Sequence, residues 1–285
     1  MADKPALDTL QPDEIAEETL HDTGEASKTR SVPVLNRALT ILEVIAAAPS
    51  GMALPEIARK LHMPKSSAHC ILLTLMRQGY LSRSQRSRRY VFSSKLLRLA
   101  SQALQGLRVR EVGIPILRQL TMSTGLSVHM AILEWPEAVL IAKVDPPGAA
   151  PLSTWMGRRM ELHCTGVGKA LMAFLPEDDL RNLLNGRVFS RHNENTITSN
   201  RRLLKEAETI RANGFALDDE EDEVGYRCIG VPILDGHGNV VAAISVAGSV
   251  AQVTNDNTKR LVEVLKRSAE AITTALSEAG PTPPA

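Results

Sequence analysis

The chain has 285 residues, a hydrophobic content of 44% and a formal net charge of +1 at pH 7, and this length allows two domains with apolar cores. No apolar run reaches the roughly 18–20 residues that a membrane-spanning helix needs. The acidic, polar N-terminus lacks the basic and apolar segments of a secretory signal peptide. The three cysteines, Cys70, Cys164 and Cys228, are too few for a disulfide framework, so we expect reduced thiols in the cytoplasm.

Positive charge is concentrated in one part of the chain. Residues 31–110 contain 13 Lys and Arg but two Asp and Glu, whereas residues 1–30 contain three basic and eight acidic residues. Residues 111–285 are acidic again, with 17 basic and 22 acidic side chains. A basic segment flanked by acidic ones is typical of a nucleic-acid-binding module. Residues 1–30 lack apolar periodicity and are predicted to form a disordered acidic tail, and the Pro-rich residues 279–285 a second one.

Residues 31–95 are predicted to form a DNA-binding domain. An amphipathic helix from Ser31 to about Ala48 is followed by two helices within residues 54–80, which a tight turn at His62 and Met63 connects. Pro64 suits the start of the second of these helices, and Gly79 the position just after its end.

The second helix of this pair begins with a polar face. Short polar side chains and a cation at an exposed helix N-terminus suit entry into the major groove of DNA, and this face consists of Lys65, Ser66, Ser67 and His69. The alternative is a helical hairpin in a core, whose polar face is merely solvated.

Residues 80–92 are predicted to form a β-hairpin with a basic tip, which is a wing after the helix-turn-helix. The tip carries Arg83, Arg86, Arg88 and Arg89, and such arginines can hold phosphates or enter the minor groove. A solvated loop is the alternative. Apolar spacing from Leu96 to about Arg110 then predicts a linker helix, which can also pack in a dimer.

Residues 111–278 show a different pattern of elements, typical of an α+β domain with an antiparallel sheet. Helices are predicted at about 111–123, 165–174, 177–184, 201–212 and 254–276, and strands at about 127–134, 138–144, 215–218, 228–234 and 240–247. The nearly continuous apolar run of the last strand predicts a central, buried position. In the acidic run Asp218–Glu223, Asp218 at the strand end is expected to face inward.

The segment Thr165-Gly-Val-Gly-Lys169 is similar to a nucleotide-binding P-loop but does not satisfy that motif. His163 stands where the motif needs a glycine, and Ala170 where it needs Ser or Thr. Thr165 can still cap a helix whose free N–H groups suit a small carboxylate, with glycines that let a ligand approach the backbone. An ordinary glycine-rich helix start is the alternative.

No metal ligand, cofactor or catalytic residue is predicted. The chain contains no Cys-x-x-Cys or His-x-x-x-His spacing that would indicate zinc. Cys164 follows His163 directly, but no third group that would orient a nucleophilic thiol is identifiable.

Three motifs in the second half of the chain carry a family resemblance. They are Leu162-His-Cys-Thr-Gly-Val-Gly-Lys-Ala170, Tyr226-Arg-Cys-Ile-Gly-Val-Pro-Ile233 and Ala242-Ala-Ile-Ser-Val-Ala-Gly248. Together with the helix-turn-helix and wing, they resemble the IclR family of bacterial transcriptional regulators over about residues 31–277.

The resemblance implies an N-terminal winged helix-turn-helix at 31–95, a linker helix at 96–110 and a GAF-like effector domain at 111–278. It also implies homodimers, often paired into homotetramers, that bind double-stranded operator DNA. Members of the family sense small metabolites of catabolic pathways, often carboxylates or aromatic acids.

Carried over by motif, the effector-binding residues are Gly166, Val167, Asp218, Tyr226, Cys228 and Ser245. The chain departs from the family pattern at three positions. Cys70 replaces a common arginine on the recognition helix, Ala247 replaces a common serine, and Tyr226 replaces a smaller aliphatic residue.

The sequence therefore predicts a ligand-responsive, sequence-specific regulator of a catabolic operon, acting as a repressor or an activator. One alternative is an architectural DNA-binding protein whose second domain only dimerises. The other is a thiol enzyme that uses Cys164 or Cys228.

Overall fold

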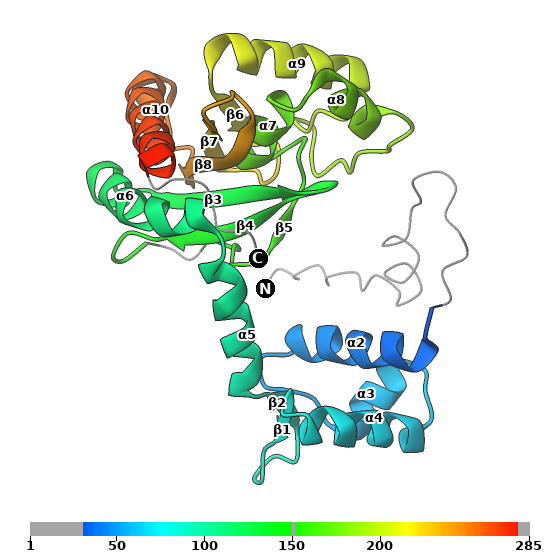
Figure 1. Ribbon diagram of the computed structural model, residues 1–285. Coiled ribbons are helices and arrows are strands. Elements are labelled where there is room, and N and C mark those ends of the chain that lie inside the picture. Colours follow the sequence, from blue (N-terminus) through cyan, green and yellow to red (C-terminus); the bar gives the residue numbers. More distant parts are fainter. Residues whose placement is uncertain (1–30, 150–151, 279–285) are drawn as a thin grey trace, which may run out of the picture. The chain divides into compact units, whose positions relative to one another are not determined.

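The computed structural model describes residues 31–149 and 152–278 (Figure 1). The tails predicted at 1–30 and 279–285 lie outside the described residues. The described chain divides into two compact units, the first ending at Gln102 and the second beginning at Ala103. None of the described helices is long and apolar enough to cross a membrane.

The first unit is a winged helix-turn-helix, as predicted. Its elements are the helices α2 (Pro33–Ala46), α3 (Leu54–Lys60) and α4 (Lys65–Arg77) and the strands β1 (Leu81–Arg83) and β2 (Tyr90–Phe92). Its apolar core is built from Ile41, Ile45, Ile57, Ile71, Leu72, Leu75, Leu81 and Tyr90. The predicted turn residues serve as expected, because His62 has φ 45° and Gly79, just after α4, has φ 76°.

The wing is an antiparallel hairpin that is tied to the chain before α3. Strands β1 and β2 pair Leu81 with Phe92 and Arg83 with Tyr90. Met52 bonds the other edge of Tyr90, with N···O distances of 3.1 and 2.7 Å. Gly51 has to be a glycine here, since a Cβ atom would lie 2.4 Å from the carbonyl oxygen of Tyr90.

The linker helix is shorter than predicted. Helix α5 covers Ser94–Gln105, and α6 starts at Arg108 and runs to Thr124, so a single helix over 96–110 is wrong. The interruption falls at Gly106 and Leu107, where glycine is a poor helix former because its backbone loses more freedom on folding. No residue of α5 is buried.

The second unit is built on one antiparallel sheet, in the order β5-β4-β3-β8-β7-β6. Its strands are β3 (Ser127–Glu134), β4 (Glu137–Val144), β5 (Arg159–Met160), β6 (Ala216–Asp219), β7 (Tyr226–Leu234) and β8 (Val240–Ser249). Its other helices are α7 (Gly166–Ala173), α8 (Glu177–Leu184), α9 (Asn200–Asn213) and α10 (Asn255–Glu278). The central place of β8 confirms the prediction from its apolar run, whereas the short strand β5 was not predicted.

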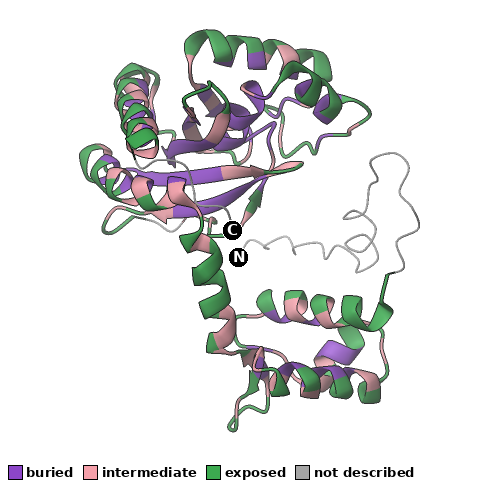
Figure 2. Ribbon diagram, viewed as in Figure 1, coloured by how far each residue is buried: buried purple, intermediate pink, exposed green. Residues whose placement is uncertain are grey.

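Helices cover both faces of this sheet, and the buried residues follow the strands between them (Figure 2). Helices α6 and α10 pack on one face against side chains such as Val128, Ile244 and Val246. Helices α7, α8 and α9 pack on the other face against side chains such as Ala131 and Ala243. Alternate residues of a strand point to opposite faces, so Ser245 lies on the α7 face.

Candidate functional site

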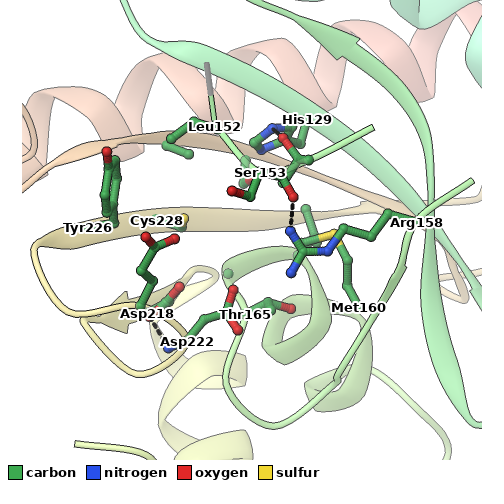
Figure 3. Close-up of a pocket in the computed structure, with 16 residues that line it drawn as sticks. His129, Leu152, Ser153, Arg158, Met160, Thr165, Asp218, Asp222, Tyr226 and Cys228 are labelled. Carbon is green, nitrogen blue, oxygen red and sulfur yellow. Dashed lines mark hydrogen bonds between the residues drawn. The ribbon is translucent and has the colours of Figure 1, made fainter. Parts of the chain in front are cut away.

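A cavity lies in the second unit where the start of α7 meets the sheet (Figure 3). It holds about 530 Å³ of space not filled by atoms, part of it open to solvent. All six residues carried over by motif line it, namely Gly166, Val167, Asp218, Tyr226, Cys228 and Ser245. The remaining lining comes mainly from the chain between β4 and α7, with His129 of β3, Ala247 of β8, and Asp222 and Glu223 of the acidic loop.

Strand register explains why these residues meet. Ser245 of β8 pairs with His129 of β3 on one side and with Gly230 of β7 on the other. Two residues further along β8, Ala247 pairs with Cys228 of β7, and Cys228 pairs in turn with Asp218 of β6. Residues paired across strands share a face of the sheet, so these two rows form the floor of the cavity.

The first turn of α7 gives the cavity its hydrogen-bond donors. The Thr165 hydroxyl caps the helix by accepting from the Gly168 amide at 3.1 Å, as predicted. The amides of Gly166 and Val167 make no hydrogen bond to another described residue, and the helix dipole favours an anion beside them.

The two glycines of this turn serve packing more than ligand approach. A Cβ atom on Gly166 would lie 3.0 Å from the Cys228 Cβ, and one on Gly168 would lie 2.4 Å from the Glu161 carbonyl oxygen. Gly166 therefore allows α7 to start close to β7, and Gly168 allows the helix to pack against the segment that precedes it.

Two polar side chains of β3 and β8 stand inside the apolar sheet. His129 is 2% exposed, and its Nε2 lies 3.0 Å from the Thr154 hydroxyl. Burial, together with the nearby charges of Lys143 and Arg158, lowers the pKa of His129 to about 4. The ring is therefore neutral at pH 7. Ser245 is buried too, and its hydroxyl makes no hydrogen bond to another described residue.

Arg158 supplies positive charge to the same cavity. Its guanidinium donates to the Ser153 carbonyl oxygen (Figure 3). It also lies 5.4 Å from the centroid of the Trp155 ring. Arg158 reaches the cavity from the connection between β4 and β5, where no sequence motif pointed to a site residue.

The opposite wall of the cavity is acidic. Asp218 is 3% exposed, and its Oδ1 accepts hydrogen bonds from the amides of Glu221 at 2.8 Å and Asp222 at 3.4 Å. Burial, together with the neighbouring acidic groups, raises the pKa of Asp218 to about 7. The inward orientation expected for Asp218 is thereby confirmed, and Asp222 and Glu223 line the same wall.

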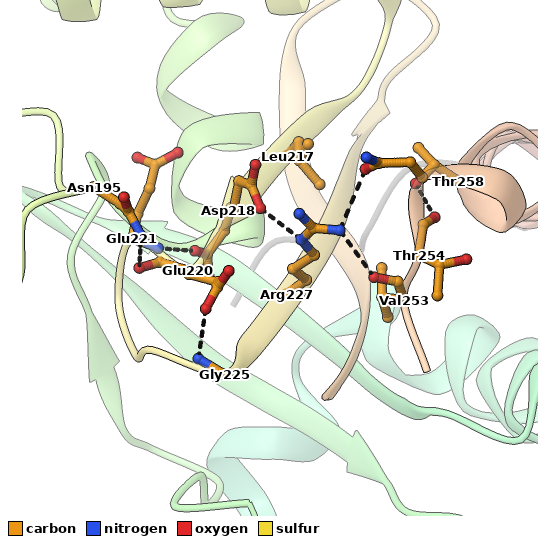
Figure 4. A network of polar contacts seen from close by, with 12 residues as sticks. Asn195, Leu217, Asp218, Glu220, Glu221, Gly225, Arg227, Val253, Thr254 and Thr258 are labelled. Carbon is orange, nitrogen blue, oxygen red and sulfur yellow. Dashed lines mark hydrogen bonds and ion pairs between the residues drawn. The ribbon is translucent and has the colours of Figure 1, made fainter. Parts of the chain in front are cut away.

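The acidic run is an ordered loop rather than a loosely solvated one (Figure 4). The Glu220 carboxylate accepts the Gly225 amide at 2.8 Å, and Asn193 and Thr196 both donate to the Glu221 carbonyl oxygen. After the loop, Arg227 donates to Asp219 at 2.5 Å and to the Val253 carbonyl oxygen at 3.4 Å. These contacts fix the loop whose Glu221 and Asp222 amides bind the Asp218 carboxyl.

Both thiols near the cavity are protonated at neutral pH. Burial raises the pKa of Cys164 and of Cys228, and the surrounding carboxylates add to the effect. A nucleophilic cysteine requires a lowered thiol pKa, so the surroundings of these thiols do not favour a thiol enzyme.

In the first unit, the residues predicted to contact DNA lie on α4 and on the wing. Lys65, Ser66 and His69 are exposed, Ser67 is half-buried, and Cys70 is exposed beside them. The wing tip is held by backbone bonds between Ser84 and residues Arg88 and Arg89. Arg86 and Arg88 are exposed there.

Arg89 differs from the other arginines of the wing. Its guanidinium binds both carboxylate oxygens of Glu56, at 2.9 and 2.8 Å, and donates to the Gly51 carbonyl oxygen at 2.7 Å. The Glu56 carboxylate also accepts the Ala53 amide at 3.0 Å, and this backbone bond, with Arg89, holds the pKa of Glu56 below its ordinary value. These contacts fasten the wing to α3, and a contact of Arg89 with DNA stays a prediction.

Each of the two units matches the model of a known protein family. The model of the IclR helix-turn-helix domain matches residues 34–85, and that of the bacterial transcriptional regulator IclR C-terminal matches residues 101–274. The chain belongs to the IclR family of bacterial transcriptional regulators. The resemblance stated from its motifs is confirmed.

Individual members of the IclR family are similar to this protein over most of its chain. The transcriptional repressor IclR of Escherichia coli K12 is 30% identical over 252 residues, which are 88% of this chain and 92% of that protein. The crystal structure of Thermotoga maritima IclR is 34% identical with a TM-score of 0.75, covering 86% of this chain and 98% of that one.

An IclR homolog from Microbacterium hydrocarbonoxydans, crystallised in complex with 4-hydroxybenzoate, shares the fold. Its TM-score is 0.76 at 22% identity, and the match covers 86% of this chain and 99% of that one.

Sequence reasoning missed several residues that line the cavity of this IclR-family chain. His129 carried a usable signal, because a polar residue stands inside an apolar strand, as Ser245 does. Arg158 and Thr154 carried none, since they come from an irregular connection. Of the three departures from the family pattern, Tyr226 and Ala247 line the cavity, and Ala247 offers no side-chain hydrogen bond.

Proposed function

We propose that this protein is a ligand-responsive transcriptional regulator that binds operator DNA as a dimer or tetramer and releases or engages it when a small organic acid enters the cavity. The main support for this proposal is that the amides of Gly166 and Val167 make no hydrogen bond to a described residue. Both residues line the cavity together with Ser245. Such a regulator works where bacterial DNA is, in the cytoplasm.

The two walls of the cavity suit a particular ligand. A carboxylate fits the donor wall of α7 amides, Ser245 and Arg158, because each offers an N–H or O–H group or positive charge. The acidic wall of Asp218 and Asp222 repels a second carboxylate but accepts a hydroxyl. A compact hydroxy acid, aliphatic or aromatic, therefore fits best. The 4-hydroxybenzoate bound by the Microbacterium homolog has this chemistry.

The DNA-binding surface consists of the α4 start and the wing tip. Lys65, Ser66, Ser67 and His69 reach the major groove, with the free amides of the first turn of α4 available to a phosphate. Arg86 and Arg88 contact the backbone or the minor groove beside it.

The mechanism is a population shift. A ligand that binds better to one arrangement of the linker formed by α5 and α6 favours that arrangement. The arrangement sets the spacing of the two recognition helices in a dimer, which has to match half-sites about one DNA turn, or a multiple of it, apart. The same population shift can produce repression or activation, depending on which arrangement of the linker binds DNA.

Fluorescence anisotropy on the DNA upstream of the protein's own gene tests this proposal, with scrambled DNA as reference and two salt concentrations. We expect a clear preference for the upstream DNA and a steep loss of affinity with salt. Lys65→Ala with His69→Ala should abolish the preference. The matched control Lys259→Ala with His237→Ala removes the same residue types at exposed positions of the second unit and should keep it.

A thermal-shift screen with small acids, led by 4-hydroxybenzoate, tests the ligand. A ligand at a hundredfold excess over its Kd should stabilise the protein by about 2.7 kcal/mol. Ser245→Ala and Asp218→Asn should weaken this response while DNA binding persists. DNA binding without any response to the acids would favour the architectural alternative, and a normal response in both variants would contradict the assignment of the cavity.

A further inference from the structure

Four metal-ligating side chains meet just before α7, and none of them lines the cavity. The donor atoms of Glu161, His163, Cys164 and His192 all lie within 4.8 Å of one another. Glu161, His163 and Cys164 belong to the segment between β5 and α7, and His192 comes from the connection between α8 and α9. The wide separation of His192 in sequence explains why no spacing motif indicated this group.

The donors already converge on one carboxylate oxygen. Glu161 Oε2 is in contact with His192 Nε2 and lies 3.8 Å from the Cys164 sulfur. In a tetrahedral zinc site with metal–ligand bonds of about 2.0–2.3 Å, neighbouring donor atoms lie roughly 3.3–3.8 Å apart. Closing the group around a metal thus requires shifts on the order of 1 Å.

Burial and hydrogen bonding hold the donors in place. His163 is 1% exposed and Cys164 is 0% exposed. The Nε2 atom of His163 lies 2.9 Å from the Ser190 carbonyl oxygen. The other ring nitrogen is left to bind a metal through its lone pair. A second-sphere bond of this kind orients most metal-binding histidines. The His192 amide is anchored in turn to the Thr196 hydroxyl at 3.2 Å.

We propose that Glu161, His163, Cys164 and His192 form a zinc site. Two imidazoles, a thiolate and a carboxylate suit Zn²⁺, whereas Mg²⁺ and Ca²⁺ prefer oxygen ligands alone. On binding, the Cys164 sulfur uses a lone pair to form the Zn–S bond, and its proton leaves to solvent. A His–Glu ion pair alone would account for the two more exposed residues but not for buried Cys164 and His163 beside them.

Zinc at this position would act on the neighbouring cavity. Thr165, which caps α7, directly follows Cys164, and Thr196 joins the His192 loop to the acidic loop through the Glu221 carbonyl oxygen at 2.8 Å. The metal would therefore clamp the α8–α9 connection to the start of α7. Both walls of the cavity would become more rigid without a direct contact between metal and effector.

Zinc titration of the full chain tests the site. The protein is stripped with a chelator, dialysed, and titrated with Zn²⁺ against a chromophoric competitor. We expect one Zn²⁺ per chain and a raised Tm. His192→Ala should lower the affinity at least roughly tenfold, because even second-sphere changes cost that much; the side chain of His192 is 36% exposed, so this variant keeps its fold. Cys164→Ala should do the same.

Co²⁺ in place of Zn²⁺ identifies the ligands by spectroscopy. Thiolate-to-cobalt charge-transfer absorption should appear in the parent chain and in the control variants Cys70→Ala and His237→Ala, both at exposed positions. It should be missing in Cys164→Ala. Binding that survives in both His192→Ala and Cys164→Ala would overturn the proposal, as would binding that is lost in Cys228→Ala or Asp218→Asn instead. A chain that takes up no Zn²⁺ would overturn it outright.

Discussion

Gly230 of β7 lies directly against Gly166 at the start of α7. A Cβ atom on Gly230 would lie 2.0 Å from the Gly166 carbonyl oxygen and 3.1 Å from the Val167 nitrogen. Both are backbone atoms, so no side-chain rotation could relieve the overlap. The absence of a side chain at Gly230 therefore sets how closely α7 approaches the sheet, and with it the position of the two unbonded amides.

Gly230→Ala should destabilise the second unit. The added methyl group forces α7 away from β7, and overpacking of this kind costs roughly 1–3 kcal/mol, a fall of several degrees in Tm. Thermal unfolding by circular dichroism measures it. Gly236→Ala is the matched control, because a Cβ atom there meets nothing within 4 Å. Equal Tm values for the two variants would contradict the packing role of Gly230.

Asp218 should make stability depend on pH. Its pKa is raised by burial from 3.8 to about 7, so between these values the folded state binds more protons than the unfolded state. The free energy of unfolding therefore falls as pH rises through this window. Asp218→Asn removes the titrating group and should remove this part of the decline.

Unfolding of both proteins by denaturant at several pH values measures the effect. The stability of the parent chain relative to Asp218→Asn should decrease from about pH 4 to about pH 7 and then stay level. The variant Asp256→Asn changes an exposed aspartate on α10 and should follow the parent curve. A constant difference between the parent chain and Asp218→Asn across the whole range would show that Asp218 ionises normally.

The elements of this fold were predictable where the information is local. The strand at 127–134 and the helix at 177–184 were predicted at their observed bounds, because apolar spacing and turn residues mark both. Strand β5 was not, since it consists of two residues and exists through pairing with Ala138 and Val139 of β4. The interruption of the linker at Gly106 is not marked by the apolar spacing, because this spacing continues on both sides of it.

The candidate site was predictable to the extent that its residues sit in motifs. The six motif residues do line one cavity, but the register that pairs His129 with Ser245 is a long-range property of the sheet. The same limit applies to the wing. Four arginines look alike in sequence, and Glu56, which binds Arg89, is 33 residues away.

Arg89 and Glu56 should act as a pair in DNA binding. If the ion pair holds the wing in position, Arg89→Ala and Glu56→Ala should weaken DNA binding to a similar degree, and the double variant should be no worse than either. Anisotropy measurements of the three variants test this. Arg86→Ala, a change on the same hairpin, should instead reduce the salt slope by about one phosphate contact and leave the Tm unchanged.

The outcome for Glu56→Ala decides between the two roles of Arg89. An arginine that contacts DNA directly would bind it as well or better once its carboxylate partner is removed, because the guanidinium is released. A gain in affinity in Glu56→Ala would therefore return Arg89 to the DNA-binding surface.

Lys169 connects α7 to the acidic loop. Its side chain is 1% exposed, and its Nζ lies 2.6 Å from Glu221 Oε1, 2.8 Å from Glu206 Oε1 and 2.6 Å from the Leu217 carbonyl oxygen. The two carboxylates hold the pKa of Lys169 above its ordinary value, against the effect of burial. The lysine is therefore charged in the folded state.

Lys169→Met should be strongly destabilising, because it leaves the buried Glu221 carboxylate without its cation. Breaking one side of a buried ion pair costs roughly 3–5 kcal/mol, which urea unfolding measures. Adding Glu221→Gln should recover part of the loss, since the second change removes the orphaned charge, whereas Lys205→Met, at an exposed position of α9, should change little. A double variant less stable than Lys169→Met would mean that Glu221 contributes through its loop contacts rather than through Lys169.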